Sequence, residues 1–142
     1  MNSRYLNIYN NLIKLTRNKS LYKTSNNFET FSDRLTIFLL HFAFFLKIYK
    51  ERTSKKELQK VYDFVFRQIE LSVREIGYGD TSINKRMKEY VNFMHSILKN
   101  VNTWDKLSLN KKLDFFSKYV DVDKESTFYV DYFNKYAFYL SK

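Results

Sequence analysis

The chain contains no proline, and its only two glycines, Gly77 and Gly79, lie within three positions of each other. Sheets joined by many tight turns depend on these two residue types, so a β-sandwich or barrel is disfavoured. The 142 residues are enough for one sizeable core, and fourteen Phe and twelve Tyr supply apolar bulk for it. The sequence therefore predicts an all-α fold, a single compact helical domain over residues 1–142 with about five to seven helices.

Apolar side chains recur at spacings of three and four, which is typical of amphipathic helices. Helices are expected at about 3–17, 33–49, 54–76, 82–101, 107–119 and 125–140. A polar connection over 18–27 separates the first two, and Ser32 or Asp33 is expected to cap the second. We expect Ile76 to end the buried stripe of the third helix.

The most apolar stretch, Ile37 to Leu46, is well short of the roughly 20 residues that a membrane span needs. A central helix buried on nearly every side explains this stretch better. His41 lies within it, and a core imidazole hydrogen-bonded to a neighbouring helix is favoured over a catalytic one.

Local signals mark the start and the end of the third helix. Ser54 and Glu57 have the spacing of a capping box, in which each side chain bonds to the other residue's backbone amide. Gly77 follows where a helix often needs a left-handed residue to stop. Two glycines so close together suggest unusual backbone conformations at both, and Asp80 is placed to cap the next helix.

The formal net charge is +10, and it is concentrated in residues 1–28 and 83–112, each of which carries +5. Such a chain is drawn to polyanions such as RNA, a ribosome surface or acidic lipid. The alternative is a compositional excess of lysine on a solvated surface. Charge alone does not decide between them.

Catalytic constellations are not found in the sequence. The two histidines, His41 and His95, have no partner at a metal-ligand interval and no triad arrangement. Cysteine is absent, and Gly77-Tyr78-Gly79 lacks the third glycine of a dinucleotide-binding turn. We therefore expect no catalytic residue, no metal site and no cofactor.

The third helix carries charges of alternating sign on one face, at spacings of four, three and four. We expect Asp63 to pair with Arg67, and Glu70 with Arg74. From composition alone this is a solvated salt-bridge ladder. The functional alternative is a rigid polar face that meets a partner.

Several strings occur in an order that resembles the ubiquinol–cytochrome c chaperone family, assembly factors for respiratory complex III. They are Asp33-Arg34-Leu35, Leu39-Leu40-His41, the segment 62–66, the segment 70–80 (ELSVREIGYGD) and the segment 83–88 (INKRMK). The resemblance covers about Tyr9 to Lys99, and the string from Arg74 to Asp80 is its most specific part. Gln68-Ile69-Glu70 departs from the family pattern, which tends toward Asp-Met-Asp.

The resemblance implies a non-enzymatic chaperone that holds newly synthesised cytochrome b until complex III is assembled. It also implies contacts with the ribosome, a second assembly factor and the membrane periphery. Because the resemblance begins near Tyr9, no transit peptide is expected. A bacterial cytoplasm beside the inner membrane is therefore favoured over a mitochondrial matrix. The candidate partner-binding residues are Asp63, Arg67, Glu70, Arg74, Glu75, Gly77, Gly79, Asp80, Lys85, Arg86 and Lys88.

Two other functions stay open at this point. One is a basic helical adapter that binds RNA or the ribosome, supported by charge and aromatic content. The other is a small enzyme acting on a lipid or isoprenoid within the bundle. That enzyme requires a deep pocket that opens onto His41.

Overall fold

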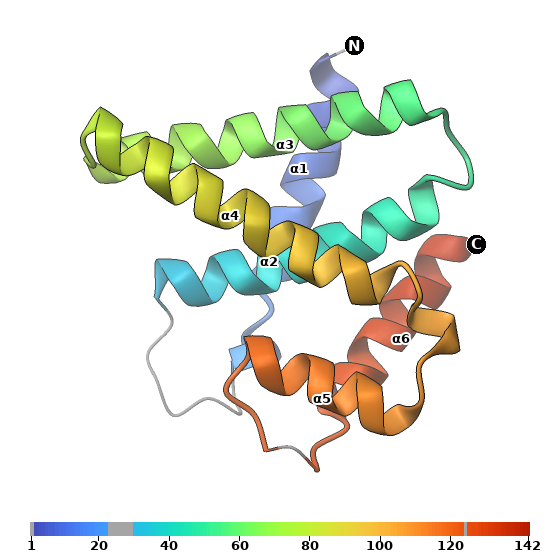
Figure 1. Ribbon diagram of the computed structural model, residues 1–142. Coiled ribbons are helices and arrows are strands. Elements are labelled where there is room, and N and C mark those ends of the chain that lie inside the picture. The colour runs from blue at the N-terminus through green and yellow to red at the C-terminus, as the bar shows by residue number, and fades with distance from the viewer. Residues whose placement is uncertain (1, 23–29, 124) are drawn as a thin grey trace.

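The computed structural model describes residues 2–22, 30–123 and 125–142. Within these ranges the chain forms six α-helices, two short 3-10 turns and no strand (Figure 1). The elements are α1 (Asn2–Thr16), η1 (Lys19–Tyr22), α2 (Phe31–Tyr49), α3 (Lys55–Ile76), α4 (Asp80–Val101), η2 (Trp104–Lys106), α5 (Leu109–Tyr119) and α6 (Phe128–Ser141). The all-α prediction is confirmed. The expected connection over 18–27 contains the turn η1, and its residues 23–27 lie outside the described residues.

The central helix α2 begins with a capping box that differs from the predicted cap. The backbone N–H of Asp33 donates to Thr30 Oγ1 over 3.1 Å, and the backbone N–H of Thr30 donates to Asp33 Oδ2 over 3.2 Å. Thr30 is therefore the cap, and the assignment to Ser32 or Asp33 is wrong. Asp33 acts from the third helical position, where its carboxylate reaches back to the cap residue.

As predicted, the stretch Ile37–Leu46 is the centre of the molecule. Its side chains are buried except for Phe45, which is half-buried. Helix α2 is contacted by α1, α4 and α6, so three helices cover it (Figure 1). None of the helices in the described residues is long and apolar enough to cross a membrane.

The ring of His41 lies in this core with both nitrogens hydrogen-bonded. Nδ1 lies 2.8 Å from the Ile37 carbonyl oxygen, which only accepts, so Nδ1 carries the proton. Nε2 then accepts from the hydroxyl of Tyr132 on α6 over 2.7 Å. Burial lowers the pKa of His41 to about 4, with the Ile37 bond opposing part of this shift. The prediction of a structural core imidazole is confirmed.

Helix α3 begins with half of the predicted capping box. The backbone N–H of Glu57 donates to Ser54 Oγ over 3.1 Å. The Glu57 side chain does not reach back to Ser54, so the reciprocal half of the prediction is wrong. The carboxylate instead pairs with Arg4 and accepts from the Tyr5 hydroxyl, both on α1. Glu57 therefore ties α1 to α3.

Helices α3 and α4 form a long hairpin. In the view of Figure 1 its joined ends extend beyond the N-terminal end of α2. Val61, Val65, Ile69 and Val73 of α3 are fully or almost fully buried. Ile76, expected in the same stripe, is 49% exposed because the last turn of α3 has run past the core.

The C-terminal third packs on α2 through aromatic rings. Trp104 of η2 lies edge-on to Phe44 and to Phe116 of α5, with ring centroids 5.1 and 5.5 Å apart. Its Nε1–H donates to Asn134 of α6 over 3.0 Å. Lys47 of α2 pairs with Asp105 of η2 over 3.0 Å. These contacts hold η2, α5 and α6 against the central helix.

Candidate functional site

The candidate residues gather around the corner, by which we mean residues 74–80 that join α3 to α4. Gly77 ends α3 with φ +103°, and its N–H donates to the Arg74 carbonyl oxygen over 3.0 Å. This left-handed conformation strains any residue with a side chain. No atom lies within 4 Å of the position a Cβ would take, so the backbone angle alone requires glycine.

Gly79 differs from Gly77. Its backbone is extended, with φ −71° and ψ 162°, and a Cβ there would also meet open space. The expectation of an unusual conformation is therefore right for Gly77 and wrong for Gly79. Gly79 is the cap of α4, which begins at Asp80, and no side-chain hydrogen bond caps this helix. Glycine is common at a helix cap, but nothing within the described residues requires it at position 79.

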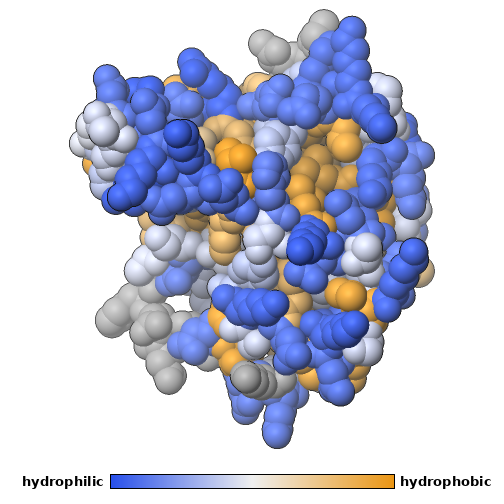
Figure 2. Space-filling view, viewed as in Figure 1, coloured by the Kyte–Doolittle hydropathy of each residue, from blue (hydrophilic) through white to orange (hydrophobic). Residues whose placement is uncertain are grey.

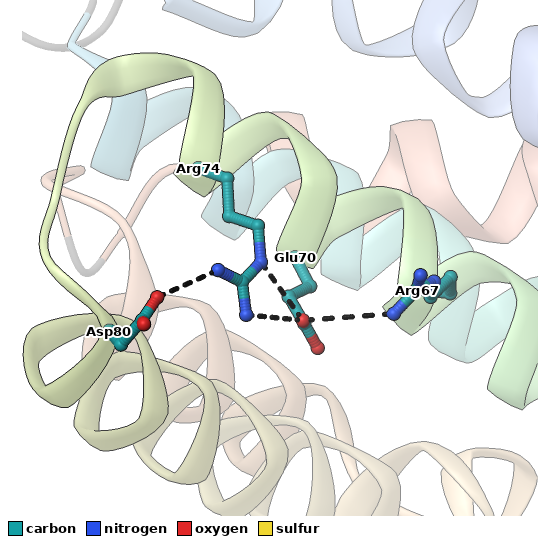
Figure 3. Close-up of polar contacts among 4 residues, drawn as sticks. All are labelled: Arg67, Glu70, Arg74 and Asp80. Carbon is teal, nitrogen blue, oxygen red and sulfur yellow. Dashed lines mark hydrogen bonds and ion pairs between the residues drawn. The ribbon is translucent and has the colours of Figure 1, made fainter.

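Arg74 connects the two sides of the corner (Figure 3). Its Nε and Nη2 donate to Glu70 Oε2 over 3.2 and 3.1 Å, and its Nη1 donates to Asp80 Oδ1 over 3.0 Å. Asp80 thus pairs across the corner and does not cap α4, contrary to the prediction. The reason is its place in the first helical turn, after the cap position. The guanidinium therefore clamps the end of α3 to the start of α4.

The predicted ladder on α3 is present only in part. Glu70 pairs with Arg74 as expected, and Arg67 Nη1 lies 3.8 Å from Glu70 Oε2. Asp63 does not pair with Arg67; it accepts from Gln59 Nε2 over 2.8 Å. Arg67 has turned toward the carboxylate three residues ahead, which leaves Asp63 to a neutral partner.

These charges face solvent. The hydrogen bonds to Asp80 and then to Glu70 raise the pKa of Arg74 above its ordinary value, so its cation is constant at any relevant pH. Exposed ion pairs contribute little to stability because water screens them. The network fixes the geometry of the corner more than it stabilises the fold.

A second contact fixes the same corner. The guanidinium carbon of Arg86 lies 3.8 Å from the ring centroid of Tyr78, a cation–π geometry. Arg86 is half-buried, and its Nε is buried without a hydrogen-bond partner in the described residues. Of the three candidate cations in the first turns of α4, Lys85 and Lys88 are exposed, whereas Arg86 is not. Arg86 instead holds the aromatic ring between the glycines.

Exposed apolar side chains accompany the charges at this end of the hairpin. Leu71, Ile76 and Tyr78 each expose more than a third of their surface, and Glu75 is exposed among them. Charged groups around exposed apolar ones are typical of surfaces that bind protein partners. Tyr78 is not among the candidate residues predicted from the sequence. An aromatic residue between the two glycines was the available signal, but its pairing with Arg86 depends on the path of the corner.

The described residues contain no group of three or more His, Asp or Glu that could hold a metal ion. The corner offers hydrogen-bond donors, carboxylates and apolar surface, and these groups suit the binding of a protein partner.

The family model described as Ubiquinol-cytochrome C chaperone matches residues 23–103. The chain belongs to the ubiquinol-cytochrome C chaperone family. The match spans α2, α3, the corner and α4, and it begins later than the resemblance at Tyr9, so α1 lies outside it. No curated protein and no solved structure matches the chain. Helices α5 and α6 also lie outside the family region.

Proposed function

We propose that this family member holds newly synthesised cytochrome b during the assembly of complex III and that the corner receives the client or a second assembly factor. The observation that carries this proposal is the Arg74 clamp. It joins α3 to α4 through Glu70 and Asp80 in the middle of the family-matched region. An exposed charge network that adds little stability is better explained as a surface kept in shape for a partner.

Gly79 also supports the proposal that the corner receives a partner. Its conformation and its surroundings would accept a side chain, so its place as the cap of α4 permits glycine but does not require it. A partner backbone that approaches closely would require it. Tyr78, held by Arg86, presents an aromatic ring beside it. Aromatic residues and arginine are enriched at the centres of protein interfaces.

The other two functions are less well supported. The lipid enzyme required a pocket that opens onto His41, and that ring is fully buried with both nitrogens hydrogen-bonded. A non-enzymatic role agrees with membership in a chaperone family. Contact with a ribosome or acidic lipid fits the exposed Lys85 and Lys88, and it would accompany the chaperone role beside a membrane.

Reversing the charge of Arg74 tests the proposal. In cells that depend on this chain, Arg74→Glu is expected to lower complex III content several-fold. The melting temperature of the purified protein should change by no more than about 3 °C, because the lost pairs are exposed. Complex III is measured by native gel, and the melting temperature by circular dichroism.

Two further variants separate a binding role from a structural one. Arg74→Glu combined with Asp80→Arg restores an ion pair across the corner in reverse. If the role of Arg74 is purely structural, complex III content should recover. If a partner contacts the Arg74 cation directly, complex III content should not recover. Lys118→Glu on α5 makes the same charge change outside the family region and should leave complex III unaltered. Normal complex III with a folded Arg74→Glu protein would refute the role of the corner.

A further inference from the structure

A groove lies between α3 and α4 at the opposite end of the hairpin from the corner. In Figure 1 the two helices diverge toward this end, and Figure 2 shows apolar surface exposed between their paths. The groove has a volume of about 430 Å³. Three helices line it. Helix α2 contributes Leu46, with Lys50 just after its end; α3 contributes Lys55, Leu58, Gln59 and Tyr62; and α4 contributes His95 and Leu98, with Asn102 just after its end.

The lining combines an apolar middle with a cationic end. Leu46, Leu58 and Leu98 come from three different helices and form the apolar part. Lys50 and Lys55 flank the connection between α2 and α3, and both are exposed. Neither lysine forms an ion pair within the described part of the chain, and none of the lining residues is acidic. An acidic group of a partner would complement this end.

Tyr62 adds a second observation that points to a bound partner. Its hydroxyl is buried, yet it has no hydrogen-bond partner among the described residues. Its ring is stacked on Phe66, with centroids 4.6 Å apart, so the hydroxyl is held in place. A buried hydroxyl without a partner costs free energy, and a movement of the groove walls as a partner enters would bring an acceptor within reach and remove that cost.

The size of the groove indicates what it receives. Its two walls run over residues 55–62 and 95–102, which at 1.5 Å per residue corresponds to about 10 Å, or two helical turns. A trough open to solvent between two helices can take a third helix that lays its apolar face into it. A segment of two turns presents apolar residues at i, i+3 or i+4, and i+7 to such a trough.

We propose that this groove binds a short helical segment of a partner protein, apolar on the face that enters and acidic where it meets Lys50 and Lys55. Only the identity of that partner, a membrane-protein client awaiting assembly, rests on the proposed function. The binding itself follows from the groove. It assigns a role to Lys50, Lys55 and Tyr62, which lie away from the corner.

Two matched synthetic peptides serve as probes. Each is about 16 residues long, long enough to form a helix, with the same leucine face. One has glutamates at both ends of that face, and the other has lysines at the same positions. Fluorescence polarisation with the whole protein should show that the glutamate peptide binds at least about tenfold more tightly than the lysine peptide. Amide NMR shifts should move at residues 55–62 and 95–102.

Three variants place the binding in the groove. Lys50→Glu with Lys55→Glu should reverse the preference between the two peptides. Lys118→Glu with Lys135→Glu makes the same charge change on α5 and α6, outside the groove and the corner, and should keep the original preference. Leu98→Ser should weaken the binding of both peptides. Circular dichroism checks that each variant is folded.

Equal affinity for the two peptides, binding of neither, or an unchanged preference in the Lys50→Glu, Lys55→Glu protein would overturn the proposal. Binding of monomeric laurate in the groove without binding of either peptide would overturn it too, because the site would then take a lipid. This assay contains no complex III. Its failure therefore leaves the Arg74 result untouched, and a negative Arg74 result leaves the peptide result standing.

Discussion

Gly77 and Gly79 lie in the same corner, but only Gly77 has a backbone conformation that requires glycine. Gly77 has a left-handed backbone, whereas Gly79 has an ordinary extended one. Gly77→Ala is therefore expected to destabilise the protein by about 1–2 kcal/mol. Gly79→Ser should stabilise it by about 0.5–1 kcal/mol, because serine can cap α4 and restricts the unfolded chain. Urea denaturation monitored by circular dichroism measures both.

The same pair of variants separates stability from binding. If a partner approaches Gly79 closely, Gly79→Ser lowers complex III content in cells although the protein is more stable. Equal destabilisation by the two substitutions would contradict the geometry of the corner. A stabilised Gly79→Ser protein with full complex III content would remove Gly79 from the partner surface.

His41 makes stability depend on pH. Its folded pKa of about 4 lies below the ordinary value of 6.5, so the unfolded chain binds more protons between these values. The stabilisation is fully present above about pH 6.5 and is lost as the pH falls toward 4. The free energy of unfolding should drop by about 2 kcal/mol from about pH 7 to pH 5 through this residue.

Denaturation of the wild type and of His41→Gln at several pH values tests this expectation. Glutamine keeps a donor for the Ile37 carbonyl and an acceptor for Tyr132 but does not titrate. The variant should therefore have a flatter profile between pH 7 and 5. Parallel profiles would show that His41 is not the group responsible.

At the scale of elements, the central helix α2 offers two phenylalanines in different surroundings. Phe38 is 4% exposed, whereas Phe45 is half-buried and stacked on Tyr49. Phe38→Ala should cost about 3–5 kcal/mol through lost transfer free energy and a cavity. Phe45→Ala should cost about 1–2 kcal/mol, because less apolar surface leaves the core. Chemical denaturation of both variants checks the ranking, and equal costs would be inconsistent with this packing.

Helix positions follow from sequence where one local signal dominates, as with the apolar run of α2 and with Gly77. Predictions of caps were less successful because a carboxylate has competing partners. Glu57 has the spacing of a capping box with Ser54, yet it pairs with Arg4 and Tyr5, which are about fifty residues earlier in the chain. The partner of the Glu57 carboxylate depends on how α1 packs on α3, and the residue spacing within α3 carries no information about that packing.

At the scale of the whole molecule, the position of the corner and the Glu70–Arg74 pair were predictable from the sequence, and the other contacts of the corner were not. The string from Arg74 to Asp80 marked the corner. The stacking of Arg86 on Tyr78 can be predicted only once the path of the chain through the corner is known. The groove near Lys55 was not predictable, because its lining residues come from three helices that share no local pattern.

The cytochrome b content of membranes tests the central claim most directly. Reduced-minus-oxidised absorbance spectra would be compared for cells with the chain, cells without it, and cells carrying Arg74→Glu. We predict a weak cytochrome b band in cells without the chain, restored by the wild type but not by Arg74→Glu, with other haem proteins unaltered. A cytochrome b band of full strength in cells that lack the chain would contradict the account.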